Sequence, residues 1–218
     1  MHFRALRMRD TIMNKPYYRR RLPHILPPGE TVFITFRLSG SLPAEVVQRL
    51  KDEREESIKQ LKSQNLSSQK IMDAIAHSYK LYFGTFDRLL DGFMKGPRWL
   101  EKKEIADIVK RDLHYYDGKD YQLLAYCIMP NHVHMAVVII NSDKPFYAIL
   151  QSLKRHSARE ANKQLNRIGN PFWHEESYDH VVRNSDELNR VMRYVLDNPV
   201  KAGLARDWDD WKYSYIRT

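Results

Sequence analysis

Residues 123–140 read LLAYCIMPNHVHMAVVII, an apolar run that a central Pro-Asn pair divides into two halves. The turn residues predict two strands joined by a tight turn, at 121–129 and 132–140. Side chains two residues apart in a strand project from the same face, so His132 and His134 would point the same way. Two imidazoles placed in this way can chelate one metal ion, whereas on a helix they would diverge. The stretch therefore predicts a β-rich core that carries a candidate metal site.

The chain of 218 residues is basic. Its 36 Lys and Arg residues outnumber 27 Asp and Glu residues, which gives a formal charge of +9 and a pI near 9.5. This charge favours a polyanionic partner, nucleic acid first. No apolar run reaches the roughly 20 residues of a membrane helix, and the single cysteine, Cys127, fits a reducing compartment. We expect a cytoplasmic protein with one core that binds nucleic acid and does not span a membrane.

The remaining hydrophobic pattern indicates a mixed α and β protein. Residues 1–30 are basic, contain several prolines and are interpreted as an N-terminal arm. The β-branched and aromatic residues of 31–38 predict a first strand. Apolar residues at helical spacing predict helices at 43–63, 67–90, 100–114 and 145–165, and a last helix that starts at Asn184 and ends at Asn198-Pro199. The charged faces of the first two helices are expected to be solvated.

The last helix carries the second informative pattern. Its start fits a capping box, because Glu187 lies three residues after Asn184. Tyr194 and Asn198 lie one turn apart on a flank beside the apolar stripe of this helix. A tyrosine hydroxyl and an amide oxygen on that flank could enter the same pocket as the two histidines.

Several short motifs follow one another along the chain. They are VFITF at 32–36, AYCIMPNHVH at 125–134, FW at 172–173, YDHVVR at 178–183 and YVLDNPVKAGL at 194–204. This order resembles the REP-associated tyrosine transposases, which belong to the single-tyrosine HUH transposases. The resemblance covers the strand near residue 31 and nearly everything from residue 97 onwards, and MPNHVH is its most specific part. The helical segment at about 43–96 looks like an insertion.

The resemblance implies a fold and an activity. The fold would be an α+β, ferredoxin-like sandwich over residues 31–218, with a central antiparallel sheet, helices packed on it and the helical insertion. The activity would be a Mg²⁺- or Mn²⁺-dependent endonuclease and strand transferase, a transposase that acts on single-stranded or hairpin DNA through a 5′-phosphotyrosine. A monomer is favoured over a homodimer.

The resemblance also implies residue roles. Tyr194 would be the nucleophile. The metal ligands would be His132, His134 and Asn198. Because imidazole is a softer ligand than Mg²⁺ prefers, we expect Mn²⁺ to bind more tightly.

Each assignment has an alternative. The histidines could be buried strand residues satisfied by hydrogen bonds, and a structural zinc site is disfavoured because no second His or Cys pair has suitable spacing. Tyr178 is a competing nucleophile, since it lies in a polar stretch near Trp173 and beside His180. The protein could also bind DNA without cleaving it, or be a metal-dependent phosphodiesterase that uses water.

Basic and aromatic residues supply candidate DNA contacts. Trp173 would either stack on an unpaired base, an interaction worth about 1 to 3 kcal/mol, or lie buried in the core. The C-terminal aromatic residues, Trp208, Trp211, Tyr213 and Tyr215, are expected mainly to pack against the sheet. Phosphate contacts are expected from Lys154, Arg155, Arg159 and Arg183.

Overall fold

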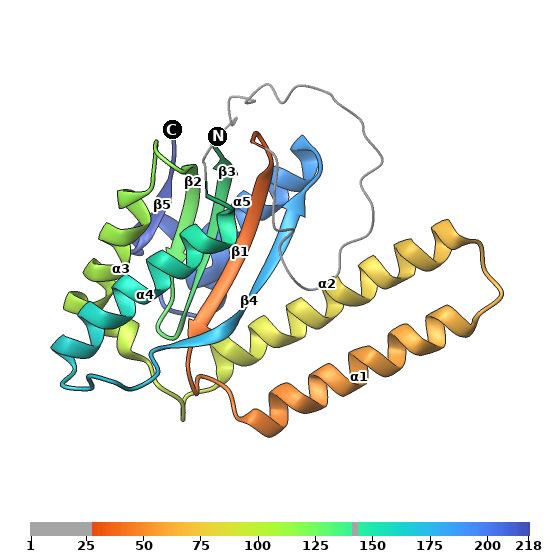
Figure 1. Cartoon of the computed structure of the whole chain (residues 1–218), viewed down its shortest axis with the longest axis horizontal. Helices are drawn as coiled ribbons and strands as arrows, with labels where there is room; N and C mark the ends of the chain where they lie inside the picture. Colours follow the sequence, from red (N-terminus) through yellow and green to blue (C-terminus); the bar gives the residue numbers. More distant parts are fainter. Residues whose placement is uncertain (1–27, 141–143) are drawn as a thin grey trace.

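The fold is a five-stranded antiparallel sheet with helices on both faces (Figure 1). The computed structural model describes residues 28–140 and 144–218, so nearly all of the predicted N-terminal arm lies outside the described residues. Each strand pairs antiparallel with its neighbours in the order β4-β1-β3-β2-β5. The strands are β1 (Thr31–Leu38), β2 (Tyr121–Ile128), β3 (His132–Ile139), β4 (Trp173–Val182) and β5 (Ser214–Ile216).

Helices cover both faces of the sheet. The described helices are α1 (Ala44–Ser63), α2 (Ser68–Gly92), α3 (Lys103–Tyr115), α4 (Phe146–Gln164) and α5 (Ser185–Lys201), with short 3₁₀ turns at Trp99–Glu101 and Trp208–Asp210. Helices α3 and α4 pack with the sheet into the main core. Helix α5 and Phe83 from α2 pack on the opposite face in a second apolar cluster. None of the described helices is long and apolar enough to cross a membrane.

Four strands and two helices form a ferredoxin-like unit. The chain runs β1-α3-β2-β3-α4-β4, and the four strands lie in the order β4-β1-β3-β2. Strand β5 adds an edge beside β2, and α5 follows the unit. The predicted α+β, ferredoxin-like fold with a central antiparallel sheet is therefore confirmed.

The hairpin β2-β3 confirms the two strands predicted from residues 123–140, each ending one residue earlier than expected. Side chains on both faces of β3 are buried, because helices cover both sides of the sheet. Strand β4 was not predicted. Its sequence, WHEESYDHVV, is mostly polar, and β4 is an edge strand whose side chains are largely half-buried or exposed.

Helix α5 continues past the point predicted for its end. The expected stop at Asn198-Pro199 is wrong, since the helix runs to Lys201 with Pro199 inside it. Proline removes one backbone donor, but the following turn still closes. The N–H of Ala202 donates to the carbonyl of Asn198, and that of Leu204 to the carbonyl of Pro199. The proline therefore lies within the last turn and does not end the helix.

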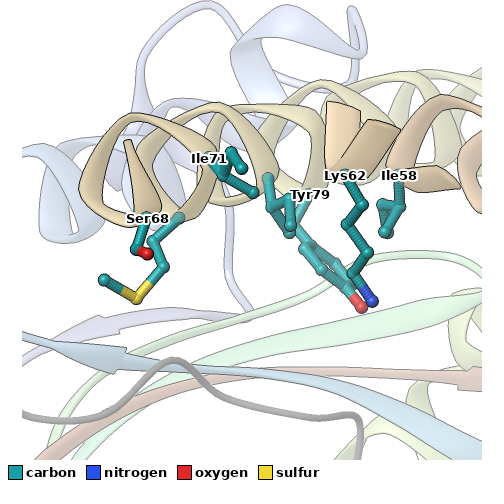
Figure 2. Close-up of a pocket in the computed structure, with 7 residues that line it drawn as sticks. Ile58, Lys62, Ser68, Ile71 and Tyr79 are labelled. Atoms are coloured by element: carbon teal, nitrogen blue, oxygen red, sulfur yellow. The ribbon is translucent and has the colours of Figure 1, made fainter. Parts of the chain in front are cut away.

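Helices α1 and α2 form a hairpin that projects from the sandwich (Figure 1). A pocket between them is lined by side chains that include Ile58, Ile71 and Tyr79 (Figure 2). Arg54 of α1 is buried, and its guanidinium lies over the ring of Tyr82 at 4.4 Å from the centroid. The predicted solvated faces hold for much of α1. The C-terminal half of α2 differs, because it returns to the sheet and buries Phe83, where it helps to form the functional site.

Three of the C-terminal aromatic residues, Trp211, Tyr213 and Tyr215, pack against the core as expected. Trp211 donates its indole N–H to the carbonyl oxygen of Ile128 at 3.0 Å. Tyr215 stacks on Tyr126, with ring centroids 5.4 Å apart. These contacts hold β5 against β2 at the edge of the sheet.

Candidate functional site

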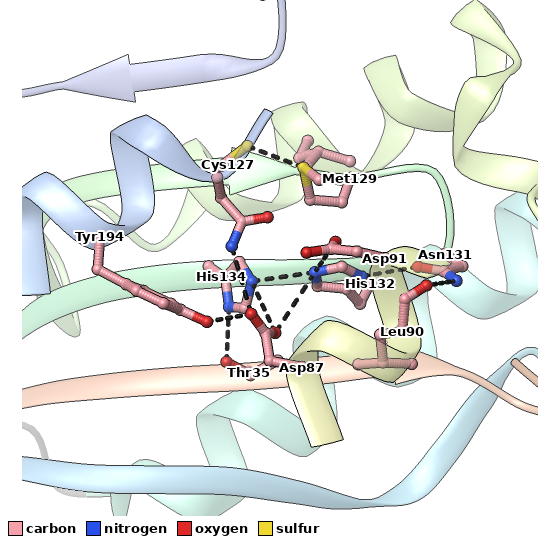
Figure 3. A network of polar contacts seen from close by, with 12 residues as sticks. Thr35, Asp87, Leu90, Asp91, Cys127, Met129, Asn131, His132, His134 and Tyr194 are labelled. Carbon is pink, nitrogen blue, oxygen red and sulfur yellow. Dashed lines mark hydrogen bonds and ion pairs between the residues drawn. The ribbon is translucent and has the colours of Figure 1, made fainter. Parts of the chain in front are cut away.

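His132 and His134 lie side by side on β3, on the face of the sheet that α5 and α2 cover (Figure 3). Both side chains are fully buried, and their Nε2 atoms are 3.0 Å apart. Burial and the neighbouring His134 lower the pKa of His132 to about 3, so its ring is neutral at pH 7. The predicted same-face pair is therefore present, with two ring nitrogens aimed at one point.

Asn131 fixes which nitrogen of His132 is free. The side-chain N–H of Asn131 donates to the backbone carbonyl of Leu90 at 2.8 Å, which orients the amide. Its oxygen then faces Nδ1 of His132 at 2.7 Å and can only accept a hydrogen bond. Nδ1 of the neutral ring must carry the proton, which leaves Nε2 with a lone pair. The asparagine of the MPNHVH motif thus prepares His132 as a metal ligand.

His134 is anchored from the neighbouring strand. Thr35 is its cross-strand partner on β1, and the hydroxyl of Thr35 lies 2.7 Å from Nδ1 of His134. This contact leaves Nε2 of His134 directed at His132 and at a carboxylate oxygen of Asp87, 3.2 Å away. Hydrogen bonds to the far nitrogen of a ligating imidazole orient the ring and raise its basicity.

Asp87 of α2 completes a cluster that the sequence did not predict. Its Oδ1 lies 3.2 Å from Nε2 of His134 and 3.8 Å from Nε2 of His132. Although burial opposes its ionisation, His134, His132 and the hydrogen bond from Tyr194 outweigh that cost and lower the pKa of Asp87 below its usual range. Among the described residues, Asp87, His132 and His134 form a group that could hold a metal ion.

A sequence signal for Asp87 existed. Phe83, Asp87 and Leu90 are spaced like the buried stripe of a helix, and all three are buried. The expectation of a solvated charged face on α2 is therefore wrong at this position. A carboxylate on an apolar stripe indicates a buried partner, because an unpaired buried charge is very costly.

Three buried oxygen atoms near the histidines have no hydrogen-bond partner in the described part of the chain. Buried acceptors are almost always paired, so a group of orphans needs an explanation. A divalent cation would supply one, because carboxylate and amide oxygens together with neutral imidazoles suit Mn²⁺ or Mg²⁺. The atoms are Oδ1 of Asp87, Oδ1 of Asp91 and Oδ1 of Asn198.

Asp91 lies one turn after Asp87 on α2. Burial and the charge of Asp87 raise the pKa of Asp91 to about 7. Its Oδ1 is 3.9 Å from Nε2 of His132. Two carboxylates and two imidazoles thus crowd one buried volume, which favours a cation between them.

Tyr194 enters the same cluster from α5. Its hydroxyl donates to Oδ2 of Asp87, and its ring lies 5.5 Å from the ring of His134. Burial and the nearby Asp87 charge raise the pKa of Tyr194 above its usual value, so the phenol is held protonated. Asn198 is also there, with its side-chain N–H directed at Oδ2 of Asp87 at 3.4 Å. The structure therefore brings together the four residues predicted for metal binding and catalysis.

Tyr178, the competing nucleophile, also lies near the site. Its ring stacks on Phe83 of α2 with centroids 4.0 Å apart and meets the edge of Phe33. Tyr194 is the tyrosine whose hydroxyl is bonded to the carboxylate of Asp87 beside the histidines. The geometry favours Tyr194.

The predicted phosphate contacts on α4 are not part of this site. Helix α4 packs on the face of the sheet opposite the histidines. Lys154 donates to the backbone carbonyls of His174 and Glu175, at 2.8 and 3.0 Å, so it joins α4 to β4. Arg155 and Arg159 are exposed on that same helix.

Two other basic residues, not predicted from the sequence, do lie at the site. Arg88 and Lys201 are exposed, and they line a surface cavity together with Asp87, Tyr194 and Asn198. Arg183, in contrast, is exposed at the turn before α5. The cations at the mouth of the site therefore come from α2 and α5.

Trp173 belongs to the core, as the packing alternative predicted. It is 8% exposed, donates its indole N–H to Ser157 at 2.9 Å and meets the edge of Phe36. We expect Trp173→Ala to lower the free energy of unfolding by about 3 to 5 kcal/mol because it leaves a large cavity. Chemical denaturation would measure this change. A stable variant that bound single-stranded DNA more weakly would instead support base stacking.

Glu187 anchors the start of α5, the helix that carries Tyr194. Only half of the predicted capping box forms. The side chain of Asn184 accepts from the N–H of Glu187, but the carboxylate of Glu187 bonds the N–H of Arg183 and the ring of His180, both at 2.9 Å. The carboxylate turns away from Asn184 because His180 on β4 offers a second donor. These contacts tie α5 to β4.

Replacing Glu187 should show this anchor in a pH profile. Burial opposes ionisation of Glu187, but the hydrogen bonds from His180 and Arg183 outweigh it and lower its pKa from 4.5 to about 2. A carboxylate whose pKa is lowered by folding stabilises the folded state at every pH above its pKa in the unfolded chain. This stabilisation is lost as the pH falls towards 2, the pKa in the folded state. We expect Glu187→Gln to cost about 2 kcal/mol at pH 7 and almost nothing near pH 2, measured by urea unfolding. An equal cost at both pH values would contradict the charge-based anchor.

Known proteins with similar sequences are transposases. The sequence model of a family described as "Transposase IS200 like" matches residues 98–198, which include both histidines, Tyr194 and Asn198. This chain resembles REP-associated tyrosine transposases. A "Putative REP-associated tyrosine transposase" of Haemophilus influenzae is 24% identical over 119 residues, or 51% of this chain and 66% of the relative. A "REP-associated tyrosine transposase" of Escherichia coli is 26% identical over 107 residues, or 49% and 57%.

The matched regions span less than two thirds of the length of these two relatives. A solved structure, described as a REP-associated tyrosine transposase bound to a REP hairpin, has a TM-score of 0.47 and 16% identity, and covers 92% of this chain and 82% of that chain. The predicted resemblance is confirmed by the family match and the two relatives. Asp87 lies outside the segment that the family model matches.

Proposed function

We propose that this protein is a metal-dependent endonuclease and strand transferase that acts on single-stranded or hairpin DNA through a phosphotyrosine at Tyr194. One observation carries the proposal. The hydroxyl of Tyr194 on α5 and the Nε2 atoms of His132 and His134 on β3 converge on the same buried carboxylate. Sequence similarity to REP-associated tyrosine transposases supports the same activity.

His132, His134 and Asn198 would hold the divalent ion. When bound, the ion would polarise the scissile phosphate and offset the charge that develops in the transition state. A buried phenol with a raised pKa is a weak nucleophile, so this electrostatic help is needed at Tyr194. His132 and His134 are oriented in advance by Asn131 and Thr35, which keeps their ligand atoms directed into the site.

The reaction at Tyr194 would be a transesterification. The bond between the tyrosine oxygen and phosphorus forms, and the bond from phosphorus to the 3′ oxygen of the preceding nucleotide breaks. The phenol loses its proton, and the leaving oxygen gains one to become a 3′-hydroxyl. Because one phosphoester bond replaces another, little bond energy is lost. A different 3′-hydroxyl can then reverse the step and join new ends.

The DNA would approach the cavity beside Tyr194. Arg88 and Lys201 line this cavity and could neutralise phosphates. The names of the relatives point to repeat-associated DNA as the class of substrate, and a DNA substrate would place the activity in the cytoplasm. Since Tyr194 reaches the histidines of its own chain, one subunit holds the whole set, which favours a monomer.

The test is a search for a covalent adduct. The protein is incubated with hairpin-containing single-stranded DNA and Mn²⁺, then denatured and separated on a gel. We expect a protein–DNA adduct that survives denaturation and needs the metal. Cleaved DNA without any adduct would favour the phosphodiesterase that uses water, and binding without cleavage would favour a DNA-binding protein of the same fold.

A further inference from the structure

We infer that Asp87, which the inserted helix α2 contributes, is a further ligand of the divalent ion through Oδ1 and orients the hydroxyl of Tyr194 through Oδ2. The insertion would then complete the active site. This inference rests on the proposed function and adds a residue that the sequence resemblance does not assign.

The two oxygens of Asp87 face different partners. Oδ1 points to the ring nitrogens of His134 and His132 and has no hydrogen-bond donor, although it is buried. Oδ2 accepts from the hydroxyl of Tyr194 and lies 3.4 Å from the amide nitrogen of Asn198. Oδ1 is therefore free for a cation while Oδ2 holds the tyrosine. A single carboxylate links the candidate metal ligands to the candidate nucleophile (Figure 3).

Helix α2 is fixed on both sides of Asp87. One turn before it, Phe83 stacks on Tyr178 and meets the edge of Phe33. Three residues after it, the backbone carbonyl of Leu90 accepts the hydrogen bond from Asn131. Such anchoring holds Asp87 in place before any ligand binds. Pre-positioned groups of this kind lower the cost of organising a site.

The charge of the insertion does not suggest a DNA-binding arm. Residues 44–92 contain eight Lys or Arg residues and eight Asp or Glu residues, so the excess positive charge of the protein lies elsewhere. A neutral hairpin gives little general attraction to a phosphate backbone. The contribution of α2 to the site is therefore local: Asp87 and Asp91 lie beside the histidines, and Arg88 lines the cavity at the mouth.

The carboxylate also bears on the choice of metal. Two imidazoles alone favour softer ions, but a carboxylate is a hard ligand that Mg²⁺ and Mn²⁺ both accept. Asp87 would thus make the site better suited to these ions than the histidine pair alone. Asp91, one turn away, keeps a second carboxylate oxygen close to His132.

The first experiment measures metal binding without DNA. Mn²⁺ is titrated into the full-length protein and into Asp87→Asn by calorimetry. We expect Asp87→Asn to weaken Mn²⁺ binding by at least about tenfold. Asp73→Asn is the matched control, because Asp73 is exposed on the same helix, and it should bind Mn²⁺ like the parent protein. Equal Mn²⁺ affinity in Asp87→Asn and the parent protein would overturn the ligand role.

The second experiment measures adduct formation at saturating Mn²⁺ and DNA. Asn keeps the shape of Asp but loses the charged acceptor, so we expect the adduct to form about 100-fold more slowly because Tyr194 is no longer held in place. An unchanged rate would overturn the orienting role. A faster rate would show that Asp87 blocks the site, and this too would overturn it.

Folding and function are checked separately. The unfolding temperatures of the metal-free variants show whether they fold, and Asp87→Ser replaces Asp87→Asn if the latter does not. If the parent protein forms no adduct, the proposed function fails, but calorimetry still decides whether Asp87 binds the ion. If the parent forms an adduct and the Asp87 variants match it in both assays, this inference alone fails.

Discussion

Replacing Tyr194 with phenylalanine should remove the denaturant-resistant adduct, with a loss of at least about 10⁴-fold in its rate of formation. Deleting the nucleophile of a covalent mechanism has effects of this size or larger. The hydroxyl of Tyr194 donates a hydrogen bond to the carboxylate of Asp87, which lies beside the histidines. Gel separation of radiolabelled hairpin DNA after denaturation would measure the loss.

Phenylalanine is a suitable replacement because the ring makes contacts of its own. The ring of Tyr194 meets those of Phe33 and Phe83, both with centroids 5.9 Å apart, and a phenyl ring keeps them. The variant should therefore fold and still bind DNA. Losing the hydroxyl leaves Oδ2 of Asp87 with only the longer hydrogen bond from Asn198, at a cost of about 1 to 3 kcal/mol in stability.

Tyr178→Phe is the matched control. Tyr178 is also a tyrosine of this cluster, and its ring stacks on Phe83. We expect this variant to form the adduct at close to the normal rate. If Tyr178→Phe lost the adduct and Tyr194→Phe kept it, Tyr178 would be the nucleophile.

Local patterns in the sequence predicted the parts of the site that lie within one element. The period of a strand placed His132 and His134 on one face, and the period of a helix placed Tyr194 and Asn198 one turn apart. Each of these predictions needs only the geometry of a single strand or helix. That the two pairs meet was a hypothesis, which the contact of both with Asp87 now supports.

The parts that the sequence did not predict depend on packing between distant elements. Asp87 reaches the histidines because a helix inserted between β1 and α3 folds back onto the sheet, a contact 45 residues or more away in sequence. The basic residues of α4 were predicted to contact DNA. Both faces of β3 are apolar enough to be covered by a helix, so α4 could have packed on either face. The pattern alone could not show that α4 lies on the face opposite His134.

Strand β4 shows a related limit. Its polar sequence lacks a clean alternation because an edge strand buries little of its surface, so local pattern was a weak guide. Pairing with β1 places Tyr178 opposite Thr35 and thereby beside the site. Such a position follows from strand register, which a single sequence does not specify for a half-exposed strand.

Replacing His134 with alanine should abolish the response to metal and lower adduct formation by at least about 10³-fold. Alanine removes Nε2, which faces both His132 and Asp87. Loss of a bound cation removes several kcal/mol of transition-state stabilisation, and about 4 kcal/mol corresponds to this rate effect. Thermal unfolding with and without Mn²⁺ would follow binding directly, since a ligand at 100 times its Kd stabilises the folded state by about 2.7 kcal/mol.

Graded controls separate loss of the ligand from loss of its orientation. His77→Ala removes an exposed histidine of α2 and should change neither readout. Thr35→Val keeps the imidazole of His134 but removes the hydroxyl 2.7 Å from Nδ1, so we expect Mn²⁺ affinity and activity to fall by about 10- to 100-fold. His134→Gln serves if the alanine variant does not fold, because it still fills the buried space. Thr35 is expected to act on Mn²⁺ only through the ring of His134, so its variant should show the smaller effect. Undiminished stabilisation by Mn²⁺ in the His134 variants would show that the ion binds elsewhere.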